Sequence, residues 1–225
     1  MNDPKEIVRT GYDAIADRYA HWAATFETPE LRWVDEFMSV LPDGADVLDL
    51  GCGGGRAPAQ AVATRHRYTG VDISGEQVAR ARRRIPGGRF IVEDATHLEL
   101  EPGSFDAVMS LFMFGHIPRA EQAPLLERIH GWLRPGGRFL TTMGTGDSDD
   151  AVDPDWLGAP MFFASFDPET NRRLFAGAGF DVARERVIVH DEPGHGLASF
   201  MWVLATRVER RVRAGARERA PRALR

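Results

Sequence analysis

The sequence is poor in cysteine and lysine, and it contains no long apolar run. Cys52 is the only cysteine among 225 residues, which excludes an internal disulfide and leaves too few thiolates for a cysteine-rich zinc site. No stretch approaches the roughly twenty apolar residues that cross a bilayer, and the charged start, Met1 to Arg9, is not followed by an apolar segment. We therefore expect a cytoplasmic protein that does not associate with a membrane.

Acidic residues outnumber basic ones in the chain as a whole, but not at its end. The formal net charge is −5, yet residues 207–225 contain eight arginines and only two acids. The rest of the protein is therefore strongly acidic, and an acidic body is a poor binder of polyanions. We expect the Arg-rich tail, residues 207–225, to be solvated and either disordered or helical, and we do not expect nucleic-acid binding.

Length and hydrophobic content favour one domain with insertions over two complete domains. The chain has 43% hydrophobic residues, enough for one substantial core. We expect residues 1–206 to form this domain, as a monomer or homodimer. Apolar residues recur at helical spacing in 6–20 and 30–41, which predicts an N-terminal helical cap over residues 1–42.

Strands alternate with helices in the middle of the chain. Predicted strands cover 47–50, 68–71, 89–92, 105–111 and 138–143, and predicted helices cover 56–64, 75–85 and 119–133, with a turn at 134–137. Helical crossovers of this kind connect parallel strands. The pattern therefore predicts an α/β fold with a mostly parallel sheet.

The last third of the chain departs from this alternation. Residues 145–167 begin with an Asp-rich stretch and end in large apolar side chains, which indicates an insertion. A helix is predicted at 168–177, followed by strands at 180–189 and 197–206. Their short connection at 190–196 cannot make a parallel crossover, so these two strands should form an antiparallel hairpin.

The segment Val47 to Gly55 is a short apolar strand that runs into a glycine turn. Glycines allow positive φ and let a ligand approach the backbone, and the helix that follows offers free N–H groups. The dinucleotide-binding fingerprint fails here because Arg56 stands where a small residue is required. Asp49 would also repel a pyrophosphate, by roughly 4 kcal/mol at 4 Å and an effective dielectric of 20. The same carboxylate would attract a cationic ligand without phosphate.

Asp72 follows the next predicted strand, about twenty residues beyond the first glycine of the turn. An acid at this position reaches ribose hydroxyls in doubly wound folds. Asp72 could instead cap the following helix, although Ser74 is better placed for that role. We expect Asp72 to bind a ribose.

These motifs resemble the class I S-adenosylmethionine-dependent methyltransferases over about two thirds of the chain. The matching segments are Val-Leu-Asp-Leu-Gly-Cys-Gly-Gly-Gly at 47–55, Gly-Val-Asp-Ile-Ser at 70–74, Glu-Asp-Ala at 93–95, Phe-Asp-Ala-Val at 105–108 and Leu-Arg-Pro-Gly-Gly at 133–137. The resemblance implies S-adenosylmethionine as cofactor. It also implies a Rossmann-like sheet of seven strands, mostly parallel with an antiparallel last strand, and helices on both faces.

The resemblance also implies a set of cofactor-binding residues. They are Asp49, Gly51, Cys52, Gly53 and the backbone of Ser110 around the methionine part, Asp72 and Ile73 at the ribose and adenine, Asp94 and Ala95 at the adenine edge, and Tyr19 on the N-terminal helix across the cofactor mouth. Glu93 could belong to this set or could equally be an ordinary acidic residue in a turn.

Acceptor-binding residues should follow the fourth and fifth strands, because ligands of open α/β sheets lie beyond the carboxyl ends of the strands. The candidates are Phe112, His116, Trp156, Met161, Phe162 and Phe163, with Tyr12 on the N-terminal helix. The aromatic insertion, residues 145–167, would be a lid over an apolar acceptor, or otherwise a core patch under a loop. His116 would act as a general base, or otherwise as a structural histidine.

The loop from His190 to His195 holds two imidazoles and two carboxylates, so a metal site must be considered. No helical or strand register brings the two histidines together and no thiolate is near, so we expect no metal. The loop could still form one wall of the acceptor pocket.

The sequence thus predicts an enzyme that moves a methyl group from S-adenosylmethionine to a small apolar or aromatic metabolite by in-line displacement. Three alternatives stay open. The first is a nucleic-acid or protein methyltransferase that uses the tail, the second a nicotinamide-dependent oxidoreductase, and the third a non-catalytic cofactor-binding module. Whether oxygen, nitrogen or carbon is methylated is also open.

Overall fold

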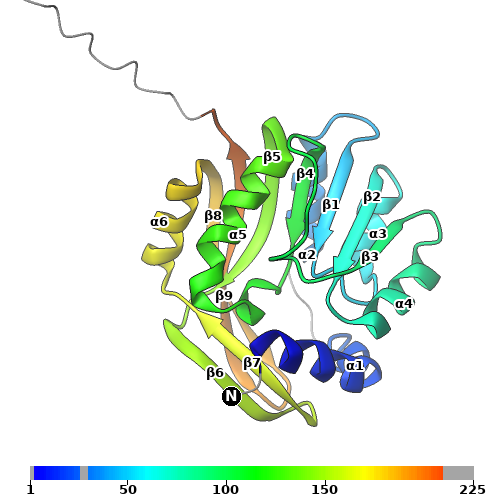
Figure 1. Ribbon diagram of the computed structural model, residues 1–225, viewed down its shortest axis with the longest axis vertical. Helices are drawn as coiled ribbons and strands as arrows, with labels where there is room; N and C mark the ends of the chain where they lie inside the picture. Colours follow the sequence, from blue (N-terminus) through cyan, green and yellow to red (C-terminus); the bar gives the residue numbers. More distant parts are fainter. Residues whose placement is uncertain (1–2, 26–29, 210–225) are drawn as a thin grey trace, which may run out of the picture.

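The computed structural model describes residues 3–25 and 30–209 and is built around a seven-stranded sheet (Figure 1). The strand order is β3-β2-β1-β4-β5-β9-β8. Pairs between β3 and β5 are parallel, whereas β9 is antiparallel to both of its neighbours. The strands are β1 Asp46–Leu50, β2 Arg67–Asp72, β3 Arg89–Val92, β4 Phe105–Ser110, β5 Leu133–Gly144, β8 Phe180–Glu192 and β9 Gly196–Arg207. The predicted mostly parallel sheet with an antiparallel last strand is confirmed.

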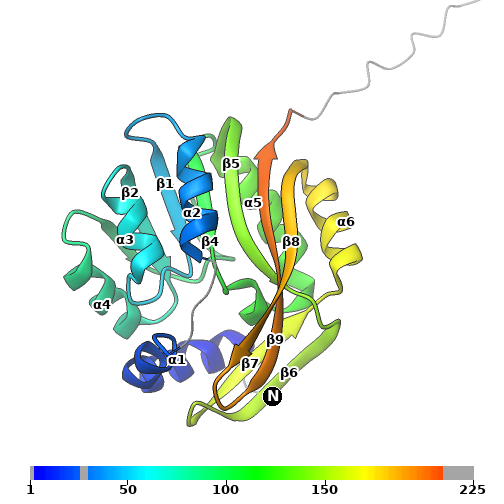
Figure 2. The ribbon, with the colours of Figure 1, turned by 180° about the vertical axis from the view of Figure 1, so that it is seen from behind.

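Helices cover both faces of this sheet, as predicted. Helices α5 and α6 lie on one face, and α2, α3 and α4 lie on the other, which is seen from behind in Figure 2. The helices are α1 Pro4–Trp22, α2 Glu30–Ser39, α3 Ala57–Ala63, α4 Gly75–Arg84, α5 Arg119–Trp132 and α6 Pro168–Ala178, with a 3-10 turn η1 at Phe114–His116. Within the described ranges, none of these helices is long and apolar enough to cross a membrane.

Alternating side chains of the strands supply the cores on the two faces. Leu48 and Val108 pack in the core beneath α5 and α6, whereas Val47 and Ala107, their neighbours along the strands, pack in the core beneath α2 and α3. Successive residues of a strand point to opposite faces, so a strand buried on both sides must be apolar at nearly every position. This explains the continuous apolar runs that predicted these strands.

A third core lies at the carboxyl edge of the parallel strands. Residues 145–167 form an antiparallel hairpin of β6 Ser148–Trp156 and β7 Ala159–Ser165, and α1 packs against β7. Ile15 and Val8 of α1 meet Met161 and Phe162 of β7 in this core. Figure 1 shows α1 crossing below the sheet beside this hairpin. Residues 145–167 thus hold a hairpin whose register shifts at two points and which packs against the N-terminal helix.

Two predicted turns differ in extent from the structure. Strand β8 runs to Glu192 and β9 begins at Gly196, so the connection is shorter than residues 190–196. Gly194 and Gly196 both have φ +84°, which permits this tight turn. Residues 134–137 fall inside β5 as a bulge, because Leu133 pairs with Phe105 and Arg138 pairs with Ala107. The tail beyond residue 209 lies outside the described residues.

Gly11 tests the packing between α1 and β7. A Cβ at this position would lie 2.7 Å from the Pro160 carbonyl oxygen and 2.8 Å from Met161 Cε, so Gly11→Ala should force the helix away from the strand. We expect a loss of about 1–2 kcal/mol in the free energy of unfolding, measured by chemical denaturation, even though alanine favours helix. Gly131→Ala in α5 is the control, because nothing lies within 4 Å of its added Cβ. Equal stability of the two variants would contradict this packing.

Candidate functional site

The glycine turn at the end of β1 leaves backbone open to a ligand. The N–H groups of Gly51 and Cys52 donate to the Val71 carbonyl at 2.8 and 3.0 Å, which joins the turn to β2. Gly51 and Gly53 have φ values of +71° and +52°, so glycine is required at both. A Cβ on Gly53 would meet nothing within 4 Å. The turn therefore has a closed side against the sheet and an open side where a ligand fits.

Asp72 ends β2 beside this turn. The N–H groups of Gly53 and Ser74 donate to its two carboxylate oxygens at 2.8 and 2.9 Å. Burial raises the pKa of Asp72 to about 6, although these two hydrogen bonds oppose the shift. The carboxylate is thus held in one orientation, with lone pairs left for hydroxyl donors.

Asp49 lies on β1 and is 3% exposed. The Tyr68 hydroxyl donates to its Oδ2 at 2.5 Å. Burial raises the pKa of Asp49 to about 7, the Tyr68 hydrogen bond opposes this, and the negative charge of Asp72 adds to it. Two buried carboxylates that each resist ionisation favour a cationic ligand, because a positive charge would relieve their repulsion.

Asp94 joins the adjoining wall to α1. Its carboxylate accepts hydrogen bonds from the Thr96 N–H and hydroxyl, each at 2.9 Å, and forms an ion pair with Lys5 Nζ at 2.8 Å. Lys5 also pairs with Glu121 on α5. Burial opposes both ionised forms, but the pairing still raises the pKa of Lys5 and lowers that of Asp94. The carboxylate therefore already anchors α1, in addition to any contact with a ligand.

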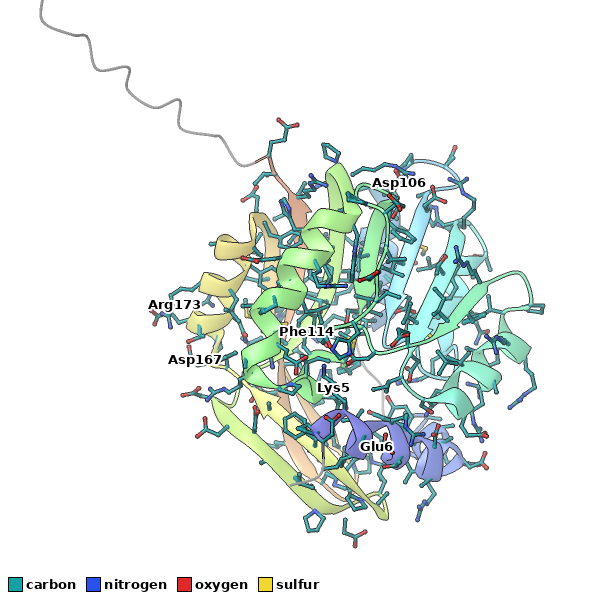
Figure 3. The ribbon with its side chains drawn as sticks, in the orientation of Figure 1. Lys5, Glu6, Asp106, Phe114, Asp167 and Arg173 are labelled. Atoms are coloured by element: carbon teal, nitrogen blue, oxygen red, sulfur yellow. The ribbon has the colours of Figure 1, made fainter. Side chains whose placement is uncertain are left out.

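Lys5 lies at the carboxyl edge of the parallel strands, where the cavities described below also lie. Figure 3 labels Lys5 between α1 and the carboxyl edge, whereas Asp106 lies at the opposite edge. Lys5, the only lysine in the sequence, was not predicted as a site residue because its partners Asp94 and Glu121 come from distant segments.

Three cavities meet at the carboxyl edge. The inner cavity is lined by residues that include Asp72, Ile73, Asp94 and Ala95, and the glycine cavity by residues that include Asp49, Gly51, Cys52 and Gly53. The outer cavity, of about 350 Å³, is lined mainly by Tyr12, Tyr19, Trp22, Phe112, His116, Trp156, Phe163 and Phe200, with Arg56, Asp153, His190, Glu192 and His195 as its polar groups.

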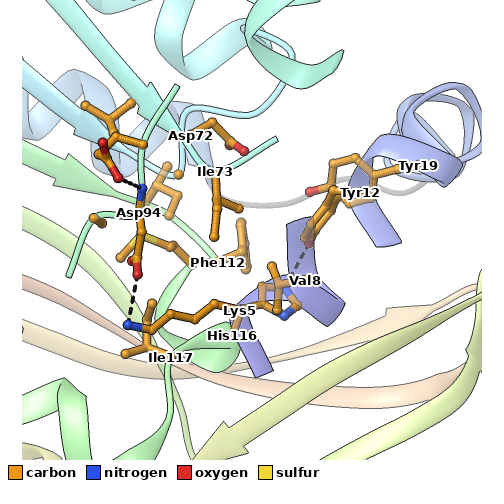
Figure 4. Close-up of a pocket in the computed structure, with 16 residues that line it drawn as sticks. Lys5, Val8, Tyr12, Tyr19, Asp72, Ile73, Asp94, Phe112, His116 and Ile117 are labelled. Carbon is orange, nitrogen blue, oxygen red and sulfur yellow. Dashed lines mark hydrogen bonds and ion pairs between the residues drawn. The ribbon is translucent and has the colours of Figure 1, made fainter. Parts of the chain in front are cut away.

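Four side chains separate these cavities. Tyr12 and His116 line both the inner and the outer cavity, and Tyr19 and Phe112 line all three. Figure 4 shows Tyr12 and Tyr19 descending from α1 toward Phe112 and His116. A ligand in the inner cavity would therefore adjoin one in the outer cavity beside these four residues, and Arg56 is a further residue shared by the outer and glycine cavities.

The aromatic wall of the outer cavity is continuous. Tyr19 and Trp22 on α1 each lie with ring centroids about 6 Å from Trp156, at 6.0 and 5.8 Å. The Trp22 indole N–H donates to the Pro193 carbonyl at 2.9 Å, which joins α1 to the tip of the β8–β9 hairpin. Helix α1, the insertion and the last hairpin thus enclose one space.

His116 is buried at this boundary, 9% exposed. Its Nε2 lies 2.8 Å from the Tyr12 hydroxyl, and its Nδ1 lies 2.9 Å from the Phe162 carbonyl. Burial lowers the pKa of His116 to about 4, against a smaller opposing effect of the bond to Phe162. The imidazole is therefore neutral near pH 7.

Most of the residues predicted from sequence converge here, and three do not line a cavity. Ser110 is fully buried, and its carbonyl accepts from the Thr141 hydroxyl at 2.7 Å. Met161 and Phe162 pack in the core between α1 and β7, and only the Phe162 carbonyl reaches the site. Trp22 was not predicted as a site residue, although Tyr12, Tyr19 and Trp22 recur at helical spacing on one face of α1. His190 and His195 do form part of the wall.

Comparison with known proteins supports the class of fold and site. Residues 47–137 match the methyltransferase domain family. The chain is similar to the 27-O-demethylrifamycin SV methyltransferase of Amycolatopsis mediterranei, at 35% identity over 60% of this chain and 57% of the relative. It is also similar to the 2-methyl-6-phytyl-1,4-hydroquinone methyltransferase of Synechocystis, at 36% identity over 52% of this chain and 37% of the relative. In both cases the chain spans less than two thirds of the relative.

Solved structures share the fold over most of the chain. The 1,6-didemethyltoxoflavin-N1-methyltransferase of Burkholderia thailandensis, solved with S-adenosylhomocysteine, has a TM-score of 0.68 at 23% identity, over 93% of this chain and 92% of that one. The magnesium protoporphyrin IX methyltransferase of Synechocystis, solved with S-adenosylmethionine, has a TM-score of 0.69 at 19% identity, over 92% and 98%. The sheet order and these likenesses show the Rossmann-like fold that the resemblance implied, and the match over residues 47–137 identifies a methyltransferase domain within it.

The buried imidazole gives a stability test. In the unfolded state His116 binds a proton below its usual pKa near 6.5, whereas in the folded state it does so only below about 4. Between these two pH values the unfolded state therefore binds more protons than the folded state. This contribution to stability is therefore present above pH 6.5 and lost as the pH falls toward 4. Between pH 7 and pH 5, wild type should lose about 2 kcal/mol more than His116→Gln in denaturant unfolding.

His21→Gln, on the exposed part of α1, controls for the removal of an imidazole. Parallel pH profiles of wild type and His116→Gln would show that His116 is not held neutral by the fold.

Proposed function

We propose that this protein transfers a methyl group from S-adenosylmethionine to a small acceptor bound in the outer cavity. The observation that carries the proposal is that the outer cavity adjoins both parts of the cofactor site. Tyr12, Tyr19, Phe112 and His116 form its partition with the inner cavity, and Tyr19, Phe112 and Arg56 lie between it and the glycine cavity. Methyl transfer requires that the two reactants approach in line and that water is excluded, which adjoining cavities allow.

The residues present fit the cofactor. Asp72 would accept hydrogen bonds from the ribose hydroxyls, and Ile73, Asp94 and Ala95 would surround the adenine. Asp49 and the open side of Gly53 would face the methionine part, whose ammonium and sulfonium suit two buried carboxylates. When bound, the cofactor supplies an electrophilic methyl group on a sulfonium.

The outer cavity suits an apolar or aromatic acceptor. Its walls are mostly aromatic, and aromatic rings pack favourably edge-to-face or offset against another ring. The relatives act, by name, on a demethylrifamycin, a hydroquinone and a didemethyltoxoflavin, which are small molecules. We assign the insertion, residues 145–167, and helix α1 to a cap over this acceptor; of the predicted N-terminal cap, residues 1–42, the part in α2 packs on the face of the sheet instead.

The alternatives considered from sequence find less support. A nucleic-acid or protein substrate would need a groove long enough for a polymer, whereas the aromatic walls line a space of only about 350 Å³. A nicotinamide dinucleotide would place its pyrophosphate against the carboxylates of Asp49 and Asp72. We therefore keep a small-molecule methyltransferase as the proposed function.

Asp72→Asn tests the cofactor half of the proposal. The variant keeps one carbonyl oxygen but loses the charge and an acceptor, so the dissociation constant for S-adenosylmethionine should rise at least about tenfold, measured by calorimetry. Asp181→Asn, exposed at the start of β8, is the matched control and should bind like wild type. Binding of a nicotinamide cofactor without S-adenosylmethionine would refute the proposal.

Phe163→Ala tests the acceptor half. A panel of aromatic hydroxyl, amine and thiol compounds would be incubated with the protein and S-adenosylmethionine, and gain of one methyl group scored by mass spectrometry. For the best acceptor, KM should rise about tenfold in the variant because an aromatic wall is lost, while cofactor affinity stays unchanged. Phe166→Ala is the control, since Phe166 lies in the same insertion but packs on Arg119 outside the cavity. An unchanged KM in Phe163→Ala would place the acceptor elsewhere.

A further inference from the structure

Three groups from separate segments form a hydrogen-bonded chain at the partition between the cavities. The Phe162 carbonyl of β7 lies 2.9 Å from His116 Nδ1, and the Tyr12 hydroxyl of α1 lies 2.8 Å from His116 Nε2. The rings of Tyr12 and His116 are nearly perpendicular, with centroids 5.3 Å apart. The dashed line in Figure 4 marks the contact between Tyr12 and His116.

The partners of His116 determine where its proton lies. A carbonyl oxygen can only accept a hydrogen bond, so Nδ1 must carry the hydrogen that is donated to Phe162. Because burial lowers the pKa of His116 to about 4, the ring is neutral and Nε2 carries a lone pair. The Tyr12 hydroxyl must therefore donate to Nε2. This assignment follows from hydrogen-bonding chemistry and orients the chain in one direction.

The orientation excludes direct proton transfer from an acceptor to the imidazole. Nδ1 is occupied by the Phe162 carbonyl, and Nε2 is occupied by the Tyr12 hydroxyl. Tyr12 lines both the inner and the outer cavity, so the remaining lone pairs of its oxygen are what an acceptor hydroxyl can reach. Any proton that reaches His116 from the outer cavity must pass through Tyr12.

We infer that Tyr12 takes the proton of a hydroxyl acceptor while passing its own proton to His116 Nε2, which makes an oxygen the methylated atom. This inference rests on the proposed function and extends it to the chemical class of the acceptor. The acceptor oxygen forms its bond to the methyl carbon as the carbon–sulfur bond breaks. The hydroxyl proton moves to Tyr12 and the Tyr12 proton to His116, so the positive charge passes from the sulfonium to the imidazole.

The surroundings of Tyr12 and His116 suit this proton relay, in which a proton passes from the acceptor to Tyr12 and from Tyr12 to His116. Burial raises the pKa of Tyr12 well above its usual range, and Tyr19, Asp72 and Glu192 add to the shift, so its hydroxyl is protonated at rest and available to donate. An oxygen that gains a methyl cation becomes strongly acidic, so even a weakly basic imidazole can accept the proton in the same step. A low pKa also lets His116 return the proton to water once the product has left.

The relay makes the insertion part of the chemistry. Phe162 lies on β7, and its carbonyl alone fixes which nitrogen of His116 carries hydrogen. Tyr12 is therefore the catalytic residue, because it would touch the acceptor, and His116 is the positioning residue that receives the final proton.

The first test reads the protonation of His116 without a substrate. In protein labelled with 15N-histidine, NMR should show a neutral His116 with hydrogen on Nδ1 and an unprotonated Nε2. In Tyr12→Phe the Nε2 resonance should shift because it loses its donor, while the remaining six histidines serve as internal references. Hydrogen on Nε2 in wild type would overturn the inference.

The second test separates proton transfer from positioning. At about pH 8, 2-naphthol keeps its proton whereas 2-naphthalenethiol is ionised, since phenols titrate near 10 and thiols lower. Tyr12→Phe and His116→Gln should each reduce kcat for 2-naphthol about ten- to a hundredfold more than they reduce kcat for the thiol, because the thiolate has no proton to lose. Gln can accept the Tyr12 hydrogen bond but cannot hold a proton, so retained activity with 2-naphthol in His116→Gln would overturn the relay.

The failure of the relay and the failure of the proposed function give different results. Equal losses with naphthol and thiol, at unchanged cofactor affinity, would leave a methyltransferase whose Tyr12 and His116 only position the acceptor. Absence of S-adenosylmethionine binding in wild type would instead remove the proposed function itself, and the inference with it.

Discussion

The docking of α1 across the carboxyl edge of the sheet is the constraint on which the site depends. The contacts that hold it include the ion pair of Lys5 with Asp94, the Ser74 hydroxyl donating to Asp13 at 2.6 Å, and the close approach of Gly11 to β7. The first two contacts use residues beside the ends of parallel strands, where the candidate cofactor-binding residues also lie. The same edge therefore both binds the helix and builds the cavities beneath it, and neither is complete without the other.

The sheet and its helices could be predicted because their signals are local. Continuous apolar runs such as 47–50 follow from burial on both faces, and the short connection before β9 required an antiparallel pair. The β6–β7 hairpin escaped prediction since β6 is exposed from Ser148 to Asp155 and carries mostly polar residues, so no apolar alternation marks it. Its fold depends on contacts with α1, more than a hundred residues away in sequence.

In the candidate site, too, residues in short local motifs could be predicted, whereas contacts between distant segments could not. Asp49, Asp72 and Asp94 could be assigned because each ends or follows a strand in a short motif, and strand ends meet at one edge. The anchoring of Asp94 by Lys5 and the tautomer of His116 could not be predicted, because both are set by partners from distant segments. Ser110 was placed by its position in the motif, yet its carbonyl is taken by Thr141, a contact that only the paired strands reveal.

The walls of the outer cavity come largely from outside the matched domain, which ends at residue 137. Tyr12, Tyr19 and Trp22 precede that domain, and Trp156, Phe163 and the tip of the last hairpin follow it. The carboxylates and the glycine turn, by contrast, all lie within it. Under the proposed function, the two flanking segments would together set the acceptor preference, and the domain between them would bind the nucleoside.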